Sequence, residues 1–161
     1  MIADPTLTSV KYHHFLTAWL QMLKNKDEAL LNSLVSPSVR FSSPAVFKTY
    51  SNKQDVMHIL MNIIEVLPSI KYSHAYDGEE GNFVLRFTAE TEVGGKKIHV
   101  EGVDIFRLND SQQVEELTVM FRPYRGLEAV MMNMGNRFVA GMSAREKLLY
   151  FVRKKLKFVG V

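Results

Sequence analysis

Residues 96–122 read KKIHVEGVDIFRLNDSQQVEELTVMFR, and their apolar side chains recur largely at every second position. That period is typical of β-strands, whose successive side chains point to opposite faces of a sheet. Asn109-Asp110-Ser111 interrupts the alternation with residues that favour turns. We therefore predict two strands, at about Lys96 to Leu108 and Gln113 to Arg122, joined as an antiparallel pair.

Two further strands precede this pair. Alternation runs through about Ile70 to Tyr76 and Asn82 to Glu92, and turn residues from Asp77 to Gly81 separate the two segments. Between the second segment and Lys96 stands Gly94-Gly95, which favours the type I′ turn of a two-residue hairpin. The four strands are therefore expected to form an antiparallel meander.

Helices flank the meander, because apolar residues there recur every three or four positions. The predicted helices span about Thr8 to Lys24, Asp27 to Val35, the segment from a capping box at Ser51-Asn52-Lys53-Gln54 to Leu67, and a segment from Leu127 that ends at Gly135. A short strand at Val39 to Ser43 separates the second helix from the third. This order indicates an α+β domain with helices on one face of a bent sheet.

The composition describes one domain with its own core. The chain has 161 residues, of which 47% are hydrophobic and 23% are charged, and this balance excludes disorder. The absence of cysteine excludes disulfide scaffolds, thiol nucleophiles, zinc fingers and iron–sulfur sites. No apolar run approaches the roughly 18 residues of a bilayer span, and the first residues do not read as a secretory signal. We expect a cytoplasmic protein.

Positive charge is concentrated at the end of the chain. From Ser143 onward six basic residues stand against Glu146 alone, whereas residues 1–142 carry a net charge of −2. A slightly acidic body argues against a nucleic-acid partner, which requires a basic stripe on the fold itself. Residues 143–161 also predict a basic amphipathic helix. Two interpretations stay open: the helix packs on its own domain, which we favour, or it lies on an anionic membrane surface.

Four segments carry a family resemblance: Arg40-Phe-Ser-Ser-Pro-Ala45, Gly102-Val-Asp-Ile-Phe-Arg107, Leu117-Thr-Val-Met-Phe-Arg-Pro123 and Leu127-Glu-Ala-Val-Met-Met-Asn-Met-Gly135. Over about residues 8–135 the chain resembles the nuclear transport factor 2-like superfamily, and within it the SnoaL-like group. The resemblance implies a cystatin-like α+β cone, with helices on a strongly bent antiparallel sheet, an internal pocket, and a homodimer paired through the outer sheet face. It makes residues 1–142 a SnoaL-like cone domain and residues 143–161 an extra C-terminal helix of that domain.

The resemblance does not fix a reaction, because one fold hosts many chemistries. Members of the superfamily include polyketide cyclases, steroid isomerases, limonene epoxide hydrolases and dehydratases. The epoxide hydrolases use two aspartates bridged by an arginine, and the matching positions in this chain are Gly102, Asp104 and Val119. Two of the three groups are missing, so the sequence argues against that activity.

Asp104 is the candidate catalytic residue. On its strand it shares a face with Ile98, Val100, Gly102 and Phe106, which makes it the one carboxylate on an otherwise apolar inward face. A desolvated carboxyl has a raised pKa, which suits proton transfer near neutral pH. In cyclases and isomerases of the superfamily a pocket aspartate takes a proton from a carbon next to a carbonyl, and Asp104 resembles that group. The alternative is a structural carboxyl, hydrogen-bonded to a tyrosine, a histidine or a backbone amide.

Further residues are expected to line the pocket because they share the inward faces of the strands or lie near the open end of the cone. They are Trp19, Tyr50, Tyr72, His74, Phe87, Val100, Gly102, Phe106, Leu117, Val119 and Phe121. Tyr72, His74 and Tyr76 fall on one face of their predicted strand. If that face is inward they would bond a ligand or Asp104, and core tyrosines bonded to the backbone are the alternative.

No metal or cofactor is predicted. The histidines lack the spacing of a ligand set, and the chain has no phosphate-binding loop or dinucleotide fingerprint. The leading hypothesis is a pocket for a small, largely apolar ligand, with Asp104 in an isomerase- or cyclase-type acid–base role. The alternative is a module of the same fold that binds a small molecule or a protein without catalysis.

Overall fold

The computed structural model describes residues 11–141, so the predicted helix at residues 143–161 lies outside the described residues. The elements in chain order are α1 His13–Asn25, α2 Glu28–Leu34, β1 Val35–Ser42, α3 Lys53–Val66, β2 Lys71–Asp77, β3 Asn82–Val93, β4 Lys96–Leu108, β5 Val114–Arg122 and α4 Tyr124–Gly141. The α+β class predicted from the sequence is confirmed.

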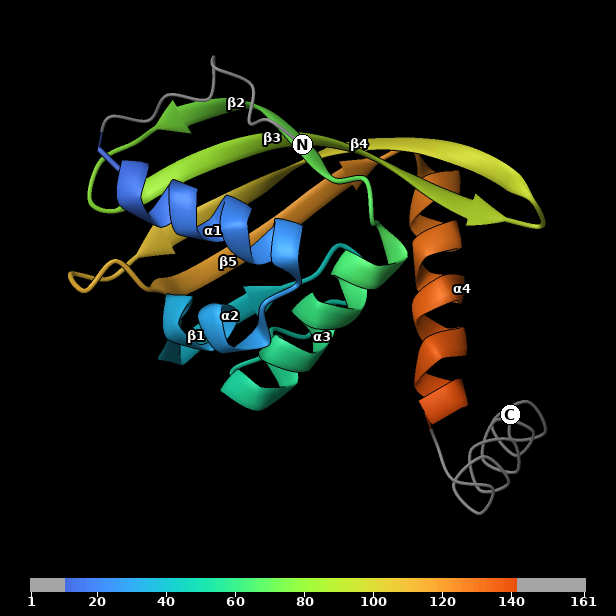
Figure 1. Cartoon of the computed structure of the whole chain (residues 1–161), viewed down its shortest axis with the longest axis horizontal. Helices are drawn as coiled ribbons and strands as arrows, with labels where there is room; N and C mark the ends of the chain where they lie inside the picture. Colours follow the sequence, from blue (N-terminus) through green and yellow to red (C-terminus); the bar gives the residue numbers. More distant parts are fainter. Residues whose placement is uncertain (1–10, 142–161) are drawn as a thin grey trace.

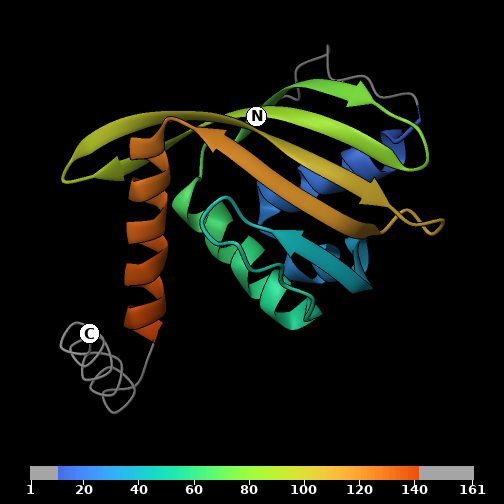
Figure 2. The same cartoon turned by 180° about the vertical axis from the view of Figure 1, so that it is seen from behind.

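The five strands form one curled sheet in the order β1-β5-β4-β3-β2. The strands β2 to β5 make the predicted antiparallel meander, but β1 pairs with β5 in parallel. The expectation of a wholly antiparallel sheet is therefore wrong, and the sheet is mixed. The helices α1, α2 and α3 lie on the concave side of the sheet. The helix α4 lies near the end of the sheet that carries the β3–β4 hairpin (Figures 1 and 2). This arrangement leaves the opposite face of the meander uncovered by the described helices.

Two predicted boundaries differ from the structure. The strand predicted at Val39 begins at Val35, and Pro37 lies inside it. A proline is tolerated there because β1 is an edge strand whose pairing with β5 is irregular between Val35 and Arg40. The last helix does not end at Gly135, since α4 continues to Gly141. Gly135 faces open space, so it costs the helix some intrinsic stability without stopping it.

Side-chain caps start two of the helices. Asp27 accepts a hydrogen bond from the backbone N–H of Leu30 (2.9 Å), and Asn52 accepts one from the N–H of Asp55 (3.1 Å). Each cap satisfies an N–H that has no partner inside its helix. The cap of α3 is thus Asn52, one residue after the Ser51 of the predicted capping box.

Aromatic rings join α1 to the inner face of the sheet. The rings of Phe83 and Phe106 stack with centroids 4.8 Å apart, and Phe15 and Trp19 of α1 meet Phe106 edge-on at 5.6 and 5.1 Å. All four side chains are buried. This cluster fixes the position of the Trp19 indole over the sheet. Within residues 11–141, the structure contains no helix that is long and apolar enough to cross a membrane.

Candidate functional site

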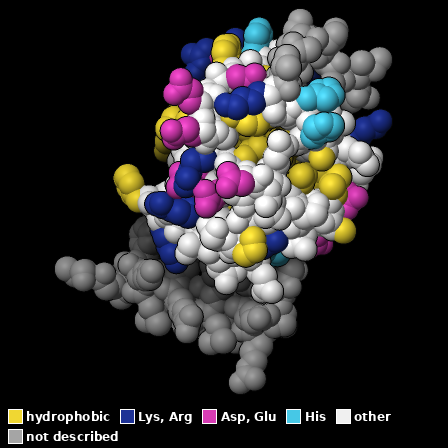
Figure 3. Space-filling view, turned by 90° about the vertical axis from the view of Figure 1, so that its left-hand side faces the viewer, with side chains coloured by type: hydrophobic (Ala, Val, Ile, Leu, Met, Phe, Trp, Pro, Cys, Tyr) yellow, Lys and Arg dark blue, Asp and Glu magenta, His cyan; other side chains and the backbone are white. Residues whose placement is uncertain are grey.

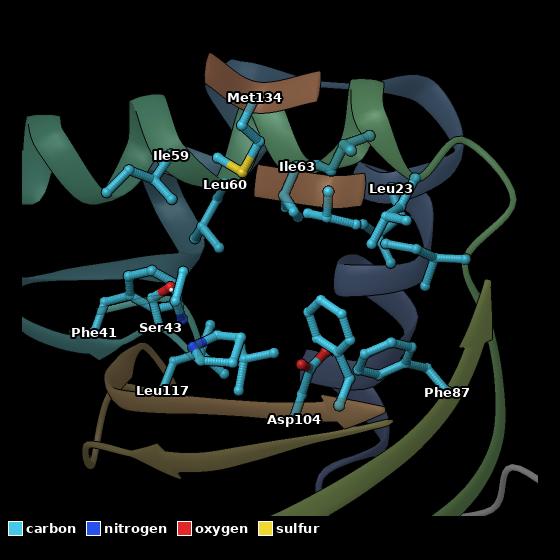
Figure 4. A pocket seen from close by; sticks show the side chains of 18 of the residues that line it. Leu23, Phe41, Ser43, Ile59, Leu60, Ile63, Phe87, Asp104, Leu117 and Met134 are labelled. Carbon is cyan, nitrogen blue, oxygen red and sulfur yellow. Dashed lines mark hydrogen bonds between the residues drawn. The ribbon is translucent and has the colours of Figure 1, made fainter. Parts of the chain in front are cut away.

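A cavity lies between the concave face of the sheet and the helices α1, α3 and α4. Its volume is about 90 Å³, several times the roughly 10–15 Å³ that one water molecule needs. Figure 4 shows Ile59, Leu60 and Met134 on the side opposite Asp104 and Leu117. The walls are almost entirely apolar, and no lysine, arginine or histidine is among the described residues that line them.

Asp104 supplies the carboxyl of this cavity. It lies on β4 between Leu85 of β3 and Val119 of β5, and only 8% of its surface is exposed. Burial among apolar side chains raises its pKa to about 7, and the hydrogen bond from Tyr72 opposes that rise. The predicted direction is therefore correct. Because its pKa lies near neutrality, both the acid and the carboxylate are populated at physiological pH.

A hydrogen-bonded chain leads from α1 to this carboxyl. The indole N–H of Trp19 donates to the Tyr72 hydroxyl (3.1 Å), and that hydroxyl donates to Oδ2 of Asp104. The pKa of Tyr72 is raised well above its ordinary value, first by burial and then by the Asp104 charge. Tyr72 therefore keeps its proton and remains a donor to Asp104. These two hydrogen bonds fix the orientation of the Asp104 carboxyl. They engage Oδ2, so Oδ1 is the other oxygen with which the carboxyl could accept a hydrogen bond.

Seven of the predicted site residues line the cavity. They are Trp19, Tyr72, Phe87, Asp104, Leu117, Val119 and Phe121. The strand residues among them come from all four strands of the meander, and those of β3, β4 and β5 lie on the faces that the alternation assigned as inward. Whether they bind a ligand remains a prediction.

Three predicted residues lie on the inner side of the sheet without lining the cavity. Val100 belongs to a separate apolar cluster with Val130 of α4, and Phe106 is enclosed in the aromatic cluster under α1. Gly102 was expected to line the pocket, but the space beside it is filled, because a Cβ there would lie 2.3 Å from the Met120 carbonyl oxygen and 2.7 Å from the Phe87 ring. These residues support the cavity walls from behind.

His74 points away from the cavity because β2 contains a bulge. Tyr72 pairs with Phe87, whereas His74 pairs with Arg86, so Ser73 is an extra residue in the strand. The insertion moves every later side chain to the opposite face. His74 and Tyr76 consequently stack on the outer face, with ring centroids 6.1 Å apart. The prediction that Tyr72, His74 and Tyr76 share a face is wrong.

Tyr50 lies at the border of the cavity, not in it. Its backbone bonds to Phe41 in both directions (2.8 and 2.9 Å), which holds the chain between β1 and α3 against the sheet. Its side chain lines a surface groove next to the cavity.

Sequence reasoning placed Trp19 of α1 at the cavity but missed most of the helical wall. Ile59 and Ile63 of α3 and Leu23 of α1 line the cavity, as do Met134 of α4 and Ser43, which follows β1 (Figure 4). Their apolar spacing indicates a buried helix face. Nothing in that spacing distinguishes a cavity wall from a filled core, because both require the same residues.

Solved structures share this fold. A steroid delta-isomerase from Pseudomonas aeruginosa is 27% identical, with a TM-score of 0.71 over 82% of this chain and 94% of its own. A protein of cystatin-like fold from Silicibacter pomeroyi is 25% identical, with a TM-score of 0.69 over 84% of this chain and 91% of its own. A protein described as a SnoaL-like polyketide cyclase, from a Jannaschia species, is 14% identical, with a TM-score of 0.60 over 81% and 96%.

No protein-family model and no curated protein sequence matches the chain. The likeness of this chain to known proteins therefore rests on structure, together with the four sequence segments quoted above. The similar structures include isomerase, cystatin-like and SnoaL-like examples. The first two agree with the resemblance to the nuclear transport factor 2-like superfamily, and the SnoaL-like polyketide cyclase, at 14% identity, shows a shared fold alone. The chain has the cystatin-like α+β fold of these proteins.

Proposed function

We propose that the cavity binds a small, largely apolar molecule and that Asp104 exchanges a proton with it, as in an isomerase- or cyclase-type enzyme. One observation carries the proposal. A single carboxyl lies in an apolar cavity, is held by Tyr72, and has its pKa raised to about 7. A carboxylate of that basicity accepts a proton from carbon more readily than an ordinary exposed aspartate does.

The reaction class follows from the groups present. The Asp104 carboxylate takes a proton from a carbon next to a carbonyl, and the resulting acid returns it to another carbon of the same molecule. This isomerisation moves a double bond and needs no oxidant or cofactor. The apolar walls favour a substrate that is mostly hydrocarbon. Similarity to the steroid delta-isomerase from Pseudomonas aeruginosa supports this class of reaction.

The test uses cyclohex-3-enone as the probe, a β,γ-unsaturated ketone of a size closer to that of a cavity of about 90 Å³ than a steroid would be. Conversion to the conjugated ketone is followed by ultraviolet absorbance, and deuterium uptake from heavy water is followed by NMR. We expect Asp104→Asn to lower kcat by about 100-fold or more, since general acid–base groups contribute on that scale. Asp110→Asn makes the same chemical change in the exposed turn after β4 and should leave the rate unchanged.

The pH dependence of the rate tests whether Asp104 acts as the base or has no part in the reaction. Because the carboxylate is the reactive form, the rate should rise with pH and level off above about pH 7. The hydrogen bond from Tyr72 lowers the pKa of Asp104, so Tyr72→Phe should move the midpoint of the profile to higher pH. An Asp104→Asn protein that converts the probe as fast as the wild type would contradict the proposal.

The alternative is a binding module without catalysis, and the Tyr72 hydroxyl favours it. That hydroxyl already accepts from Trp19 and donates to Asp104, so the three groups also make a self-contained structural network. Under this alternative the probe binds, with chemical shift changes at residues that line the cavity, but no deuterium enters it. The two outcomes come from the same NMR sample.

The partner proposed from the family resemblance is a second copy of the chain. The outer sheet face presents Glu101 between Arg86 and Arg122, with Met120 exposed beside them. Charges of both signs suit a face that pairs with itself. The end of the molecule that carries the β4–β5 turn likewise mixes acidic and basic side chains (Figure 3). Sedimentation of the full chain at several concentrations tests the homodimer.

A further inference from the structure

A surface groove lies beside the cavity and shares a wall with it. The loop after β1 and the helices α3 and α4 line the groove. The residues that line both spaces are Ser43, Ala45, Ile59, Met131 and Met134. Whatever covers the groove therefore supports the cavity wall from outside.

The groove is apolar and partly open to solvent. Met131 and Phe138 of α4 are 45% and 36% exposed, and Val46 of the loop after β1 is 43% exposed. Met131, Met134 and Phe138 are three and four positions apart, which is the spacing of a helix face that packs against a partner. Asp55 is the only Asp, Glu, Lys or Arg among the described residues of the groove. A row of exposed apolar side chains along one helix indicates a contact surface, whereas single ones do not.

The chain that follows α4 starts beside this groove. The helix ends at Gly141, soon after Phe138. The sequence predicts that another helix begins directly afterwards, because Ser143 and Glu146 have the spacing of a capping box. A connection this short joins helices that lie side by side and antiparallel. Residues 143–161, which we call the tail, are therefore expected to run back along α4.

The tail has an apolar stripe that matches the groove in position. On the predicted helix, Leu149, Val152 and Leu156 are three and four positions apart. In an antiparallel pair that turns at Met142, residues equally far from the turn lie opposite each other. Met131 stands eleven residues before Met142, and Val152 stands ten residues after it. This register places the stripe of the tail opposite the stripe of α4.

We infer that the tail of the same chain occupies the groove, antiparallel to α4, with Val152 against Met131. The charges suit this occupant, because the tail has six basic residues against one acidic residue and residues 1–142 have a net charge of −2. The inference involves neither Asp104 nor a ligand. Its failure and the failure of the proposed function are therefore observed separately.

Methionine oxidation of the full chain tests the inference. Met131 lines the groove, whereas Met132, the next residue, is 57% exposed and does not line it. Oxidation by hydrogen peroxide follows exposure, and mass spectrometry reads each methionine of the wild type separately. We expect Met131 to be oxidised about tenfold or more slowly than Met132, because the tail covers it. Without a cover, the two methionines should react at similar rates.

Substitutions in the tail identify what covers the groove. Val152→Asp places a charge in an apolar contact, so Met131 should be oxidised as fast as Met132. Val161→Asp makes the same chemical change about two and a half turns further along the predicted helix, on its opposite side, and should leave Met131 protected. The natural chain has no cysteine, so engineered pairs report directly. Met131→Cys with Val152→Cys should form a disulfide within one chain faster than Met132→Cys with Val152→Cys.

The inference is overturned if Met131 and Met132 of the wild type are oxidised at the same rate. It is also overturned if Val152→Asp leaves Met131 protected, or if Val161→Asp exposes it equally. Protection that is lost on dilution, or a disulfide that joins two chains, would show that a second copy of the chain occupies the groove instead.

Discussion

Two carboxylates on β4, three residues apart, show how the two faces of one strand differ. Asp104 points into the cavity, where burial raises its pKa to about 7. Glu101 lies on the outer face, where the Arg122 and Arg86 guanidiniums lower its pKa. The strand alternation alone separates them, since odd positions in this segment face out and even positions face in.

The two pKa values differ because different groups replace water around the two carboxylates. Glu101 accepts hydrogen bonds from Nε of Arg122 (2.7 Å) and from Nη2 of Arg86 (3.1 Å), and 29% of its side chain stays exposed. Asp104 loses its water and gains the Tyr72 hydroxyl, with no cation among the described residues of the cavity. A carboxylate without a cation in an apolar site is unstable as an anion, which makes it reactive.

The largest expected effect is the pH dependence of stability caused by Asp104. Its pKa is about 7 in the folded protein and 3.8 ordinarily, so the folded state holds the proton more tightly than the unfolded state. This contribution to the free energy of unfolding is therefore highest below about pH 4, falls as pH rises towards 7, and is constant above. The fall is roughly 4 kcal/mol. Urea unfolding between pH 4 and 8 measures it.

Asp104→Asn isolates that contribution, because every other titrating group is retained. The variant should lose less stability than the wild type between pH 4 and 7, and the difference between the two curves should grow from about pH 4 and level off near the pKa of Asp104. Two curves that run parallel across this range would mean that the carboxyl is not desolvated. The contrast with Glu101 would then disappear.

A smaller loss of stability is expected from a substitution at Gly102, which lies between the two carboxylates in the sequence. An added Cβ would collide with the Met120 carbonyl oxygen and the Phe121 Cβ, and would press on the Phe87 ring. Gly102→Ala should therefore destabilise the protein by about 2–3 kcal/mol, as overpacking of a filled site does. Gly135→Ala is the matched control, because its Cβ meets open space in α4 and should be neutral or stabilising. Equal stability of the two variants would show that β4 and β5 separate easily.

The strands could be predicted because apolar and polar residues alternate along them, and the apolar positions mark the buried face. This pattern placed Asp104, Phe87 and Leu117 on the inner face, and all three are buried. It failed at β2, where the alternation continues through Ser73 but the register does not. A bulge inserts a residue without changing the pattern of residue types, so the sequence carries no sign that His74 turns outward.

The cavity itself could not be predicted from the sequence, because a cavity is a property of packing between elements. Ile59, Ile63 and Met134 satisfy the same helical spacing whether or not a side chain fills the space before them. The parallel position of β1 was also missed. β1 is the first strand in the chain and β5 is the last, and nothing in the sequence of β1 identifies its partner. The structure shows the pairing, for example that of Phe41 with Leu117.

The smallest expected effect is at Glu101, and it sharpens the comparison with Asp104. Glu101→Gln removes the charge from the outer network, where solvent and salt already screen it, so the free energy of unfolding should change little and less still at high salt. The midpoint of the Asp104 titration should not move. A large loss of stability that grows as the protein is concentrated would point to Glu101 buried between two copies of the chain. Carboxylates on both faces of β4 would then be desolvated. The pKa of Glu101 would stay low because Arg86 and Arg122 would be its hydrogen-bond donors in place of water.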